Sequence, residues 1–179
     1  EEDVLEHVGL FLDDGKQPQL QQMVMGEEAI QQFALRRYQI NLLVDHGDRE
    51  DAPIVYEENP TFQNLIGQIE HRSMQGALIT DFTLIKGGAL HRASGGYLIL
   101  DAYQVLTKPY AWEGLKRAIQ TGEIRIESLV QSLGMMSTVS LEPETVSLDA
   151  KIVLIGERIV YYLLCTHDPD FGELFKVAA

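Results

Sequence analysis

The stretch around Gly95 and Asp101 constrains the fold of this chain more than any other. Two glycines, Gly95 and Gly96, precede four apolar residues, Tyr97 to Leu100, and the run stops at an acid, Asp101. A short apolar run bounded in this way predicts a strand buried on both faces, which is typical of a parallel sheet. An acid at the carboxyl end of such a strand lies where open α/β sheets bind ligands.

Two interpretations of Asp101 stay open at the level of local pattern. Aspartate is a favoured N-cap, so Asp101 is expected to begin a helix after a core strand. A hydrophobic strand ending in Asp is also the Walker B pattern with which phosphate-binding ATPases hold Mg²⁺. The matching phosphate loop, G-x-x-x-x-G-K-[ST], is absent. The only Gly-Lys pair, Gly15-Lys16, is followed by Gln17 in place of Ser or Thr, and Leu10 stands at the position of the first glycine.

Further apolar runs alternate with helical patterns along the chain. Three strands are predicted most clearly, at 54–57, 97–101 and 152–156, with a fourth at 40–45. Residues 110–120 form an amphipathic pattern that Gly122 should end. The predicted fold class is α/β, a parallel sheet with flanking helices (41–179) after an N-terminal helical segment (1–40).

Several shorter segments give local expectations. A helix is expected over 62–70, a hairpin-like loop over 76–88, a strand over 123–127, and a helix or loop over 129–136. Segments 138–141 and 146–148 are expected to pair with each other. Two helices, 158–164 and 171–177, should close the chain.

Charge and cysteine content limit the partners. The net charge of −13 argues against sequence-independent nucleic-acid binding and against an anionic membrane surface. No apolar run approaches the length of a membrane span. The single cysteine, Cys165, lies in an apolar run and is expected to be a small buried hydrophobe, and the absence of a disulfide framework fits a reducing cytoplasm. Both ends of the chain suggest a piece of a longer protein.

Common catalytic motifs are missing. There is no G-x-S-x-G sequence and no cysteine–histidine metal cluster, and the charged segment 46–51 is expected to be a solvated loop. The scattered histidines, His71, His91 and His167, are expected to be structural.

Several segments together resemble the bacterial Lon-related, LonB-like AAA+ proteases. They are NPTFQNLIGQIE at 59–70, TDF at 80–82, GALHRASGGYLILDA at 88–102, LEPE at 141–144, LDAKIVLIGER at 148–158 and DPDFGELFKV at 168–177. The resemblance covers roughly residues 40–177.

The resemblance implies a ring-forming, ATP-dependent serine protease as the parent protein, assembled as a hexamer around protein substrates. Its Walker A loop would lie upstream and its Ser/Lys protease domain downstream, so these residues alone would bind no ATP or Mg²⁺ and would be inactive. Residues 41–179 would be the later part of an AAA+, P-loop NTPase-like module, with Asp101 as the Walker B acid. Asp101 and Glu157, which follows the sensor-1 strand, would be its nucleotide- and Mg²⁺-binding residues. Arg117 or Arg158 would reach a neighbour's γ-phosphate.

The segment 76–88 resembles an insertion loop that related modules point at the central pore, with Phe82 or Leu84 as the apolar contact. Residue-level alternatives remain: Arg117 on the polar face of a helix is solvated by default, and Phe82 equally fits a core plug.

Two positions depart from the AAA+ pattern. Ala102 stands where most AAA+ proteins have the glutamate that polarises water, and Glu157 stands where the sensor-1 strand usually delivers Asn. Losing a water-positioning group costs about 10²–10⁴-fold in rate. Either another acid such as Glu157 substitutes for it, or hydrolysis is slow even in the parent protein. Three hypotheses follow: an ATPase module, a non-catalytic interaction or ring-assembly domain with a degenerate nucleotide site, and an unrelated α/β small-molecule binder.

Overall fold

The computed structural model describes residues 38–47, 51–74, 77–127 and 141–178. The chain divides into two compact units, Glu1–Asn41 and Leu42–Ala179, and the description below concerns the second. The helices predicted within 1–37 lie outside the described residues, as do the predicted segments 129–136 and 138–140.

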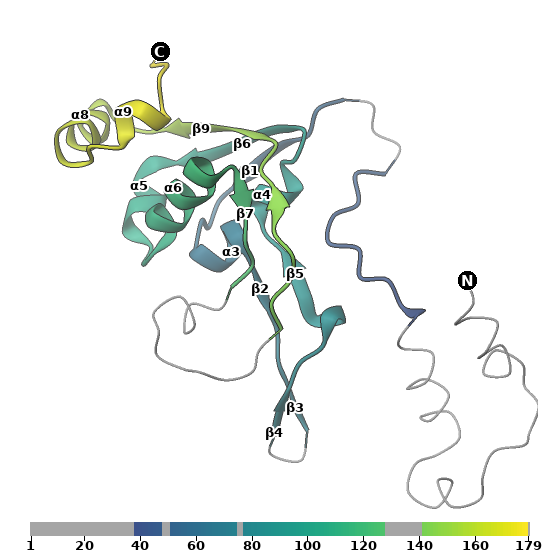
Figure 1. The fold of residues 1–179 in the computed structure, drawn as a ribbon. Coiled ribbons are helices and arrows are strands. Elements are labelled where there is room, and N and C mark those ends of the chain that lie inside the picture. Colours follow the sequence, from purple (N-terminus) through teal and green to yellow (C-terminus); the bar gives the residue numbers. More distant parts are fainter. Residues whose placement is uncertain (1–37, 48–50, 75–76, 128–140, 179) are drawn as a thin grey trace, which may run out of the picture. The chain divides into compact units, whose positions relative to one another are not determined.

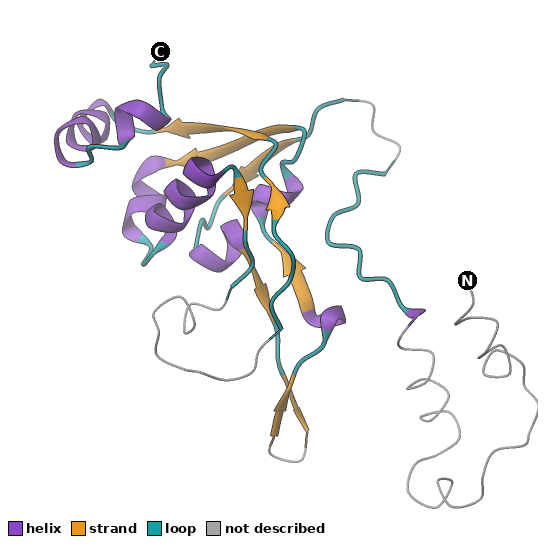
Figure 2. Ribbon diagram, viewed as in Figure 1, coloured by secondary structure: helices purple, strands orange, loops and turns teal. Residues whose placement is uncertain are grey.

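A three-stranded parallel sheet forms the centre of this unit (Figures 1 and 2). Its strands are β1 (Ile54–Glu57), β6 (Gly96–Asp101) and β9 (Ala150–Ile155), in the order β1-β6-β9. The register pairs Val55 with Leu98 and Leu98 with Ile152. The three strands predicted most clearly are therefore confirmed, and so is the α/β class.

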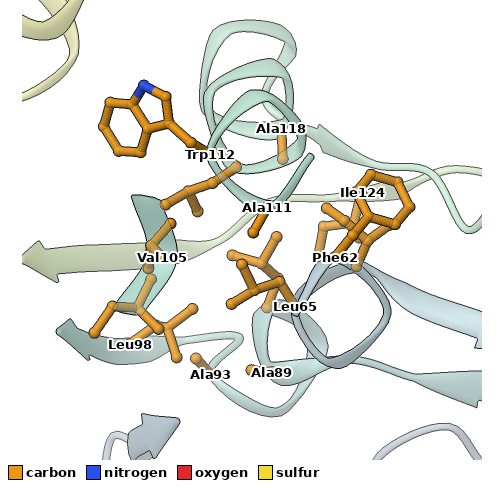
Figure 3. Packing of buried hydrophobic residues seen from close by; sticks show 14 of the residues in the cluster. Phe62, Leu65, Ala89, Ala93, Leu98, Val105, Ala111, Trp112, Ala118 and Ile124 are labelled. Carbon is orange, nitrogen blue, oxygen red and sulfur yellow. The ribbon is translucent and has the colours of Figure 1, made fainter. Parts of the chain in front are cut away.

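One face of the sheet carries the core. It packs against α3 (Phe62–Ile66), α4 (Ala89–Arg92), α5 (Ala102–Thr107) and α6 (Ala111–Thr121). Leu98 from β6 is fully buried there with Leu65 and Leu115 from the helices, and Figure 3 shows how Leu65, Leu98, Val105 and Ala111 converge. Alternate residues of each strand point into this layer, as the two-residue period of a strand requires.

The opposite face of the sheet is open. Five of its large apolar side chains are exposed: Ile54, Tyr56, Tyr97, Val153 and Ile155. The expectation that the central strand is buried on both faces is therefore wrong, because no described element covers this side of β6.

Helix α6 follows its predicted pattern. Trp112, Leu115 and Ala118 are buried at helical spacing, while Gly122 ends the helix with a left-handed φ of 69°. Two further helices, α8 (Arg158–His167) and α9 (Phe171–Leu174), follow β9. Both helices predicted for the end of the chain are present, α8 longer than expected and α9 shorter.

A β-ribbon (67–87) is inserted between α3 and α4 (Figure 1). β2 (Gly67–Ile69) pairs antiparallel with β5 (Ile85–Gly87), and β3 (Arg72–Met74) pairs with β4 (Ala77–Ile79). The predicted hairpin is present but begins earlier, and the predicted helix 62–70 stops at Ile66. Gly67 explains the stop: its φ is 103°, and a Cβ there would lie 2.5 Å from the Lys86 carbonyl oxygen.

Other sequence expectations are wrong. Residues 40–45 form no strand, and Ile40 and Leu42 are 90% and 67% exposed. β8 (Val146–Ser147) pairs with β7 (Glu123–Ile124), and the strand predicted over 123–127 is only two residues long. The partner predicted for 146–148 lies mostly outside the described residues. Cys165 is exposed on α8. Among the described residues, no helix has the length and apolarity needed to cross a membrane.

His91 anchors the base of the β-ribbon from inside the protein. It is 5% exposed, and its Nδ1 accepts the Gly88 N–H at 3.2 Å. Its Nε2 is buried without a hydrogen-bond partner among the described residues. Burial, with a smaller contribution from the Arg92 charge, lowers the pKa of His91, so the folded protein favours the neutral ring.

We expect His91 to make the protein less stable in mild acid. Because the pKa is lower in the folded state, its contribution is complete above the unfolded pKa of about 6.5 and is lost as pH falls toward the folded pKa. Urea unfolding of the wild type and His91→Asn between pH 7.5 and 5 should diverge below about pH 6.5, with a steeper fall in the wild type. Asn keeps an acceptor for the Gly88 N–H but does not titrate, so parallel curves would contradict this role.

Candidate functional site

The carboxyl ends of β6 and β9 meet at one edge of the sheet. Asp101 is in register with Ile155, and the next residues, Ala102 and Gly156, touch: a Cβ on Gly156 would lie 3.2 Å from the Ala102 Cβ. The residue that follows β6 therefore lies beside the residue that follows β9. This edge, the carboxyl edge, is where ligands bind in open α/β sheets.

Asp101 both ends β6 and begins α5. Its Oδ1 accepts the Gln104 N–H at 2.8 Å, which is the hydrogen bond of a helix N-cap. The side chain is half-buried, and no other hydrogen bond to the carboxylate is found among the described residues. One carboxylate oxygen thus caps the helix, and Oδ2 stays available for another ligand.

Ala102 is buried beside this carboxylate. It is 6% exposed, and its methyl group faces Gly156 across the two loops. Alanine at this position therefore packs beside Gly156 and supplies no carboxylate.

Glu157 and Arg158 lie at the same edge, on the β9 side. Glu157 is the N-cap residue of α8, and its carbonyl oxygen accepts the Val160 N–H at 3.0 Å. Its exposed side chain makes no capping hydrogen bond. Arg158 is the first residue of α8 and is exposed, with no ion pair found among the described residues. The fold therefore brings Asp101 and the backbone of Glu157 to one edge.

Arg117 lies elsewhere. The Leu148 N–H donates to the Gly122 carbonyl at 2.8 Å, so α6 ends near the start of β9, at the edge opposite Asp101. Arg117, in the second half of α6, pairs with Glu127. An open pocket of about 180 Å³ lies next to it between α3, α6 and β7, and neither Asp101 nor Glu157 lines that pocket.

The two apolar candidates for substrate contact differ in exposure. Both belong to the 3₁₀ turn η3 (Phe82–Leu84) within the β-ribbon. Leu84 is 4% exposed and its carbonyl accepts the Glu70 N–H at 2.9 Å, whereas Phe82 is half-buried. Leu84 therefore presents no side chain at the surface in this conformation.

A polar junction between α6 and the C-terminal helices was not predicted from the sequence. Trp112 Nε1 donates to Asp168 Oδ2 at 2.6 Å, and Lys116 Nζ lies 2.9 Å from the same oxygen. Burial of Asp168 acts to raise its pKa, but the hydrogen bonds from Lys116 and Trp112 outweigh it, and the pKa is lowered overall. The hydrogen bond to Asp168 raises the pKa of Lys116. Sequence pattern indicated Asp168 only as a helix-capping residue.

The chemistry of the carboxyl edge fits a magnesium–nucleotide complex in part. Mg²⁺ is usually bound through one or two carboxylates together with phosphate oxygens and water, and Asp101 offers one such oxygen. No group of three potential metal-binding side chains exists among the described residues. The described part of the edge therefore offers one uncommitted carboxylate oxygen, of the kind that Mg²⁺ takes as a ligand.

Comparison with known protein families identifies the family to which this sheet belongs. A family model described as "LonB-like, AAA domain" matches residues 50–179, which include all three parallel strands and the carboxyl edge. A comparison with curated proteins found no match. Because the match extends over well more than half of the chain, the chain belongs to the LonB-like AAA domain family.

Proposed function

We propose that these residues form the metal-side half of the nucleotide site in the AAA+ ATPase module of a Lon-like protein. The observation that carries the proposal is the placement of Asp101: it ends the middle strand of the parallel sheet and keeps one carboxylate oxygen uncommitted. A Mg²⁺–ATP complex bound there would supply phosphoryl chemistry. In that complex Asp101 would orient the metal while still capping α5.

The open face of the sheet supports the proposal that residues outside the described unit form the second half of the nucleotide site. Parallel sheets are normally covered on both faces, yet Tyr56, Tyr97 and Val153 are exposed. No G-x-x-x-x-G-K-[ST] loop occurs in the 179 residues. We propose that a strand, phosphate-binding loop and helix elsewhere in the longer protein cover this face and complete the phosphate site.

Glu157 is the proposed water-positioning group. Ala102 has no functional group, and the closest following acid on the neighbouring loop is Glu157, whose side chain is free of capping contacts. An exposed carboxylate at the same edge of the sheet as Asp101 would accept a proton from an attacking water. The two acids would then follow adjacent strands, with Asp101 at the end of β6 and Glu157 two residues after β9.

The remaining roles complete the proposal. The β-ribbon (67–87) would contact protein substrates and couple nucleotide binding to their movement, with Phe82 as the more accessible of the two apolar candidates. Arg158 or Arg117 would act on a neighbouring subunit of a hexameric ring. Of the two, Arg117 would first have to leave Glu127. The whole protein would be an ATP-dependent cytoplasmic protease.

ATP hydrolysis by the intact longer protein tests this proposal. Asp101→Asn should lower kcat by about 10²–10³-fold, because it removes the charge that orients the metal. The matched control is Asp149→Asn, an exposed aspartate just before β9 at the opposite edge of the sheet. Equal rates for Asp101→Asn and the control would contradict a metal role for Asp101.

One observation favours a second candidate function, a non-catalytic ring-assembly or interaction domain. A buried alanine, Ala102, stands beside Asp101 where glutamate is usual in AAA+ proteins, so the carboxylate that polarises water is absent from this position. In that case nucleotide would bind without turnover. Binding of Mg²⁺–ATP by the intact protein with no hydrolysis, and no change in Glu157→Gln, would favour this function over the first.

A further inference from the structure

Asp168 forms a buried polar junction between two parts of the fold that are distant in sequence. Its side chain is 11% exposed. One carboxylate oxygen, Oδ2, accepts a hydrogen bond from Trp112 Nε1 at 2.6 Å and lies 2.9 Å from Lys116 Nζ. Its other oxygen accepts the Asp170 N–H at 3.0 Å. Both carboxylate oxygens are thus satisfied, which fixes the position of the carboxylate.

Aromatic packing surrounds this junction. Trp112 stacks on Phe175 with centroids 6.0 Å apart and contacts Phe171 at 6.3 Å. Phe171 is 5% exposed and also meets the edge of Tyr161 from α8. The polar bonds therefore lie beside an apolar contact that joins α6, α8 and α9.

The junction connects the two segments that carry the proposed site. One segment runs from Asp101 through α5 to α6, and the other runs from Glu157 through α8 to Asp168 (Figure 1). Along α8 only Leu164 is buried, with Val160 half-buried against the core and the Tyr161 ring in contact with Phe171. Asp168 adds a polar anchor at the C-terminal end of this helix.

We propose that Asp168 is a positioning residue for Glu157. By fastening the far end of α8 to α6, it holds the Glu157 carboxylate beside Asp101, and it touches neither nucleotide nor metal. This inference rests on the proposed function of Glu157 as the water-positioning group. A displacement of about 1 Å in such a group is enough to lower the rate about 10²-fold.

A double-mutant cycle with ATP hydrolysis as the readout tests the inference in the intact longer protein. Asp168→Ala should lower kcat by about 10- to 10²-fold with little change in KM. Asp168→Asn, which keeps one acceptor oxygen for Trp112 Nε1 and loses the second, should recover part of that loss. Combining Asp168→Ala with Glu157→Gln should lower kcat no further than Glu157→Gln alone, because both act through one carboxylate.

The matched control is Asp170→Ala, which removes only the longer 3.4 Å ion pair with Lys116. It should leave kcat within about twofold, since exposed ion pairs contribute little. Hydrogen exchange provides a second readout: α8 amides should exchange about 10- to 100-fold faster in Asp168→Ala than in the control. If Asp168→Ala does not fold, Trp112→Phe is used in its place, because it removes the Nε1–H that donates to Asp168. Its loss of kcat should likewise not add to that of Glu157→Gln.

Each outcome separates the two proposals. Additive losses in the cycle, or unchanged kcat in Asp168→Ala despite faster exchange of α8, overturn the positioning role and leave the proposed function standing. An intact protein with no turnover, or turnover insensitive to Glu157→Gln, overturns the role of Glu157 and with it the role of Asp168.

Discussion

Gly96→Ala should destabilise the protein by about 3 kcal/mol or more. A Cβ at this position would lie 2.0 Å from the Pro53 carbonyl oxygen and 2.8 Å from the Pro53 nitrogen. Both contacts are with backbone, which cannot rotate away as a side chain can. The Pro53 oxygen also accepts the Tyr97 N–H at 2.8 Å, so relief of the clash would separate β1 from β6 where their pairing begins.

Urea unfolding of the wild type and Gly96→Ala measures this effect. The control is Gly172→Ala in α9, where an added Cβ meets no atom within 4 Å and the backbone is helical. Alanine there should be neutral or stabilising by up to about 1 kcal/mol. If Gly96→Ala unfolds at the same urea concentration as the wild type, the close approach of Pro53 to β6 is wrong.

Leu98→Ala should cost about 2–5 kcal/mol of stability. Leu98 is fully buried at the centre of β6, with Val55 and Ile152 beside it in register on the two flanking strands. Its removal leaves a cavity under the helices that no neighbouring side chain is placed to fill. A loss of this size is a large part of the roughly 5–15 kcal/mol that stabilises a typical domain.

The control for Leu98 is the same substitution on an exposed site. Leu163 on α8 is 49% exposed, so Leu163→Ala should change stability by less than about 1 kcal/mol. Chemical denaturation monitored by circular dichroism gives both values. Similar losses at the two positions would mean that the layer under β6 is not the core of the unit.

The sequence predicted the elements whose signals are local. Tyr97 to Leu100 and Ile152 to Ile155 are strands because apolar β-formers are bounded by glycine or charge, and α6 is helical because its buried residues recur at helical spacing. Gly122 ended α6 as expected. These features depend on residues within one or two turns of each other, which pattern alone can interpret.

Features that depend on distant residues were not predicted. The apolar run 40–45 has strand character, yet the structure has no strand there and Ile40 is exposed, because hydrophobicity does not specify a partner strand. Cys165 lies in an apolar run on a helix of which only one residue is buried. The helix from Phe62 stops at Ile66 because Gly67 approaches the backbone of Lys86, nineteen residues later.

In the candidate site too, local pattern identified one residue, whereas contacts between distant residues were not predicted. Asp101 was identified by position, at the end of an apolar run, and the structure places it at the carboxyl edge. Its neighbours were harder to interpret: Ala102 looked like a missing base, and only the structure shows its methyl packed against Gly156. The bond from Trp112 to Asp168 joins residues 56 apart, for which the sequence carries no pattern.

The measurement that most directly tests the metal role of Asp101 is Mn²⁺ binding in the presence of a non-hydrolysable ATP analogue, followed by electron paramagnetic resonance. Asparagine caps helices about as well as aspartate, so Asp101→Asn should keep the Gln104 hydrogen bond and lose only the charge. In the intact longer protein we expect Asp101→Asn to weaken Mn²⁺–nucleotide binding by about 10- to 100-fold, with wild-type stability and with Asp149→Asn unchanged. Wild-type Mn²⁺ affinity in Asp101→Asn would contradict the account and leave Asp101 as a helix cap alone.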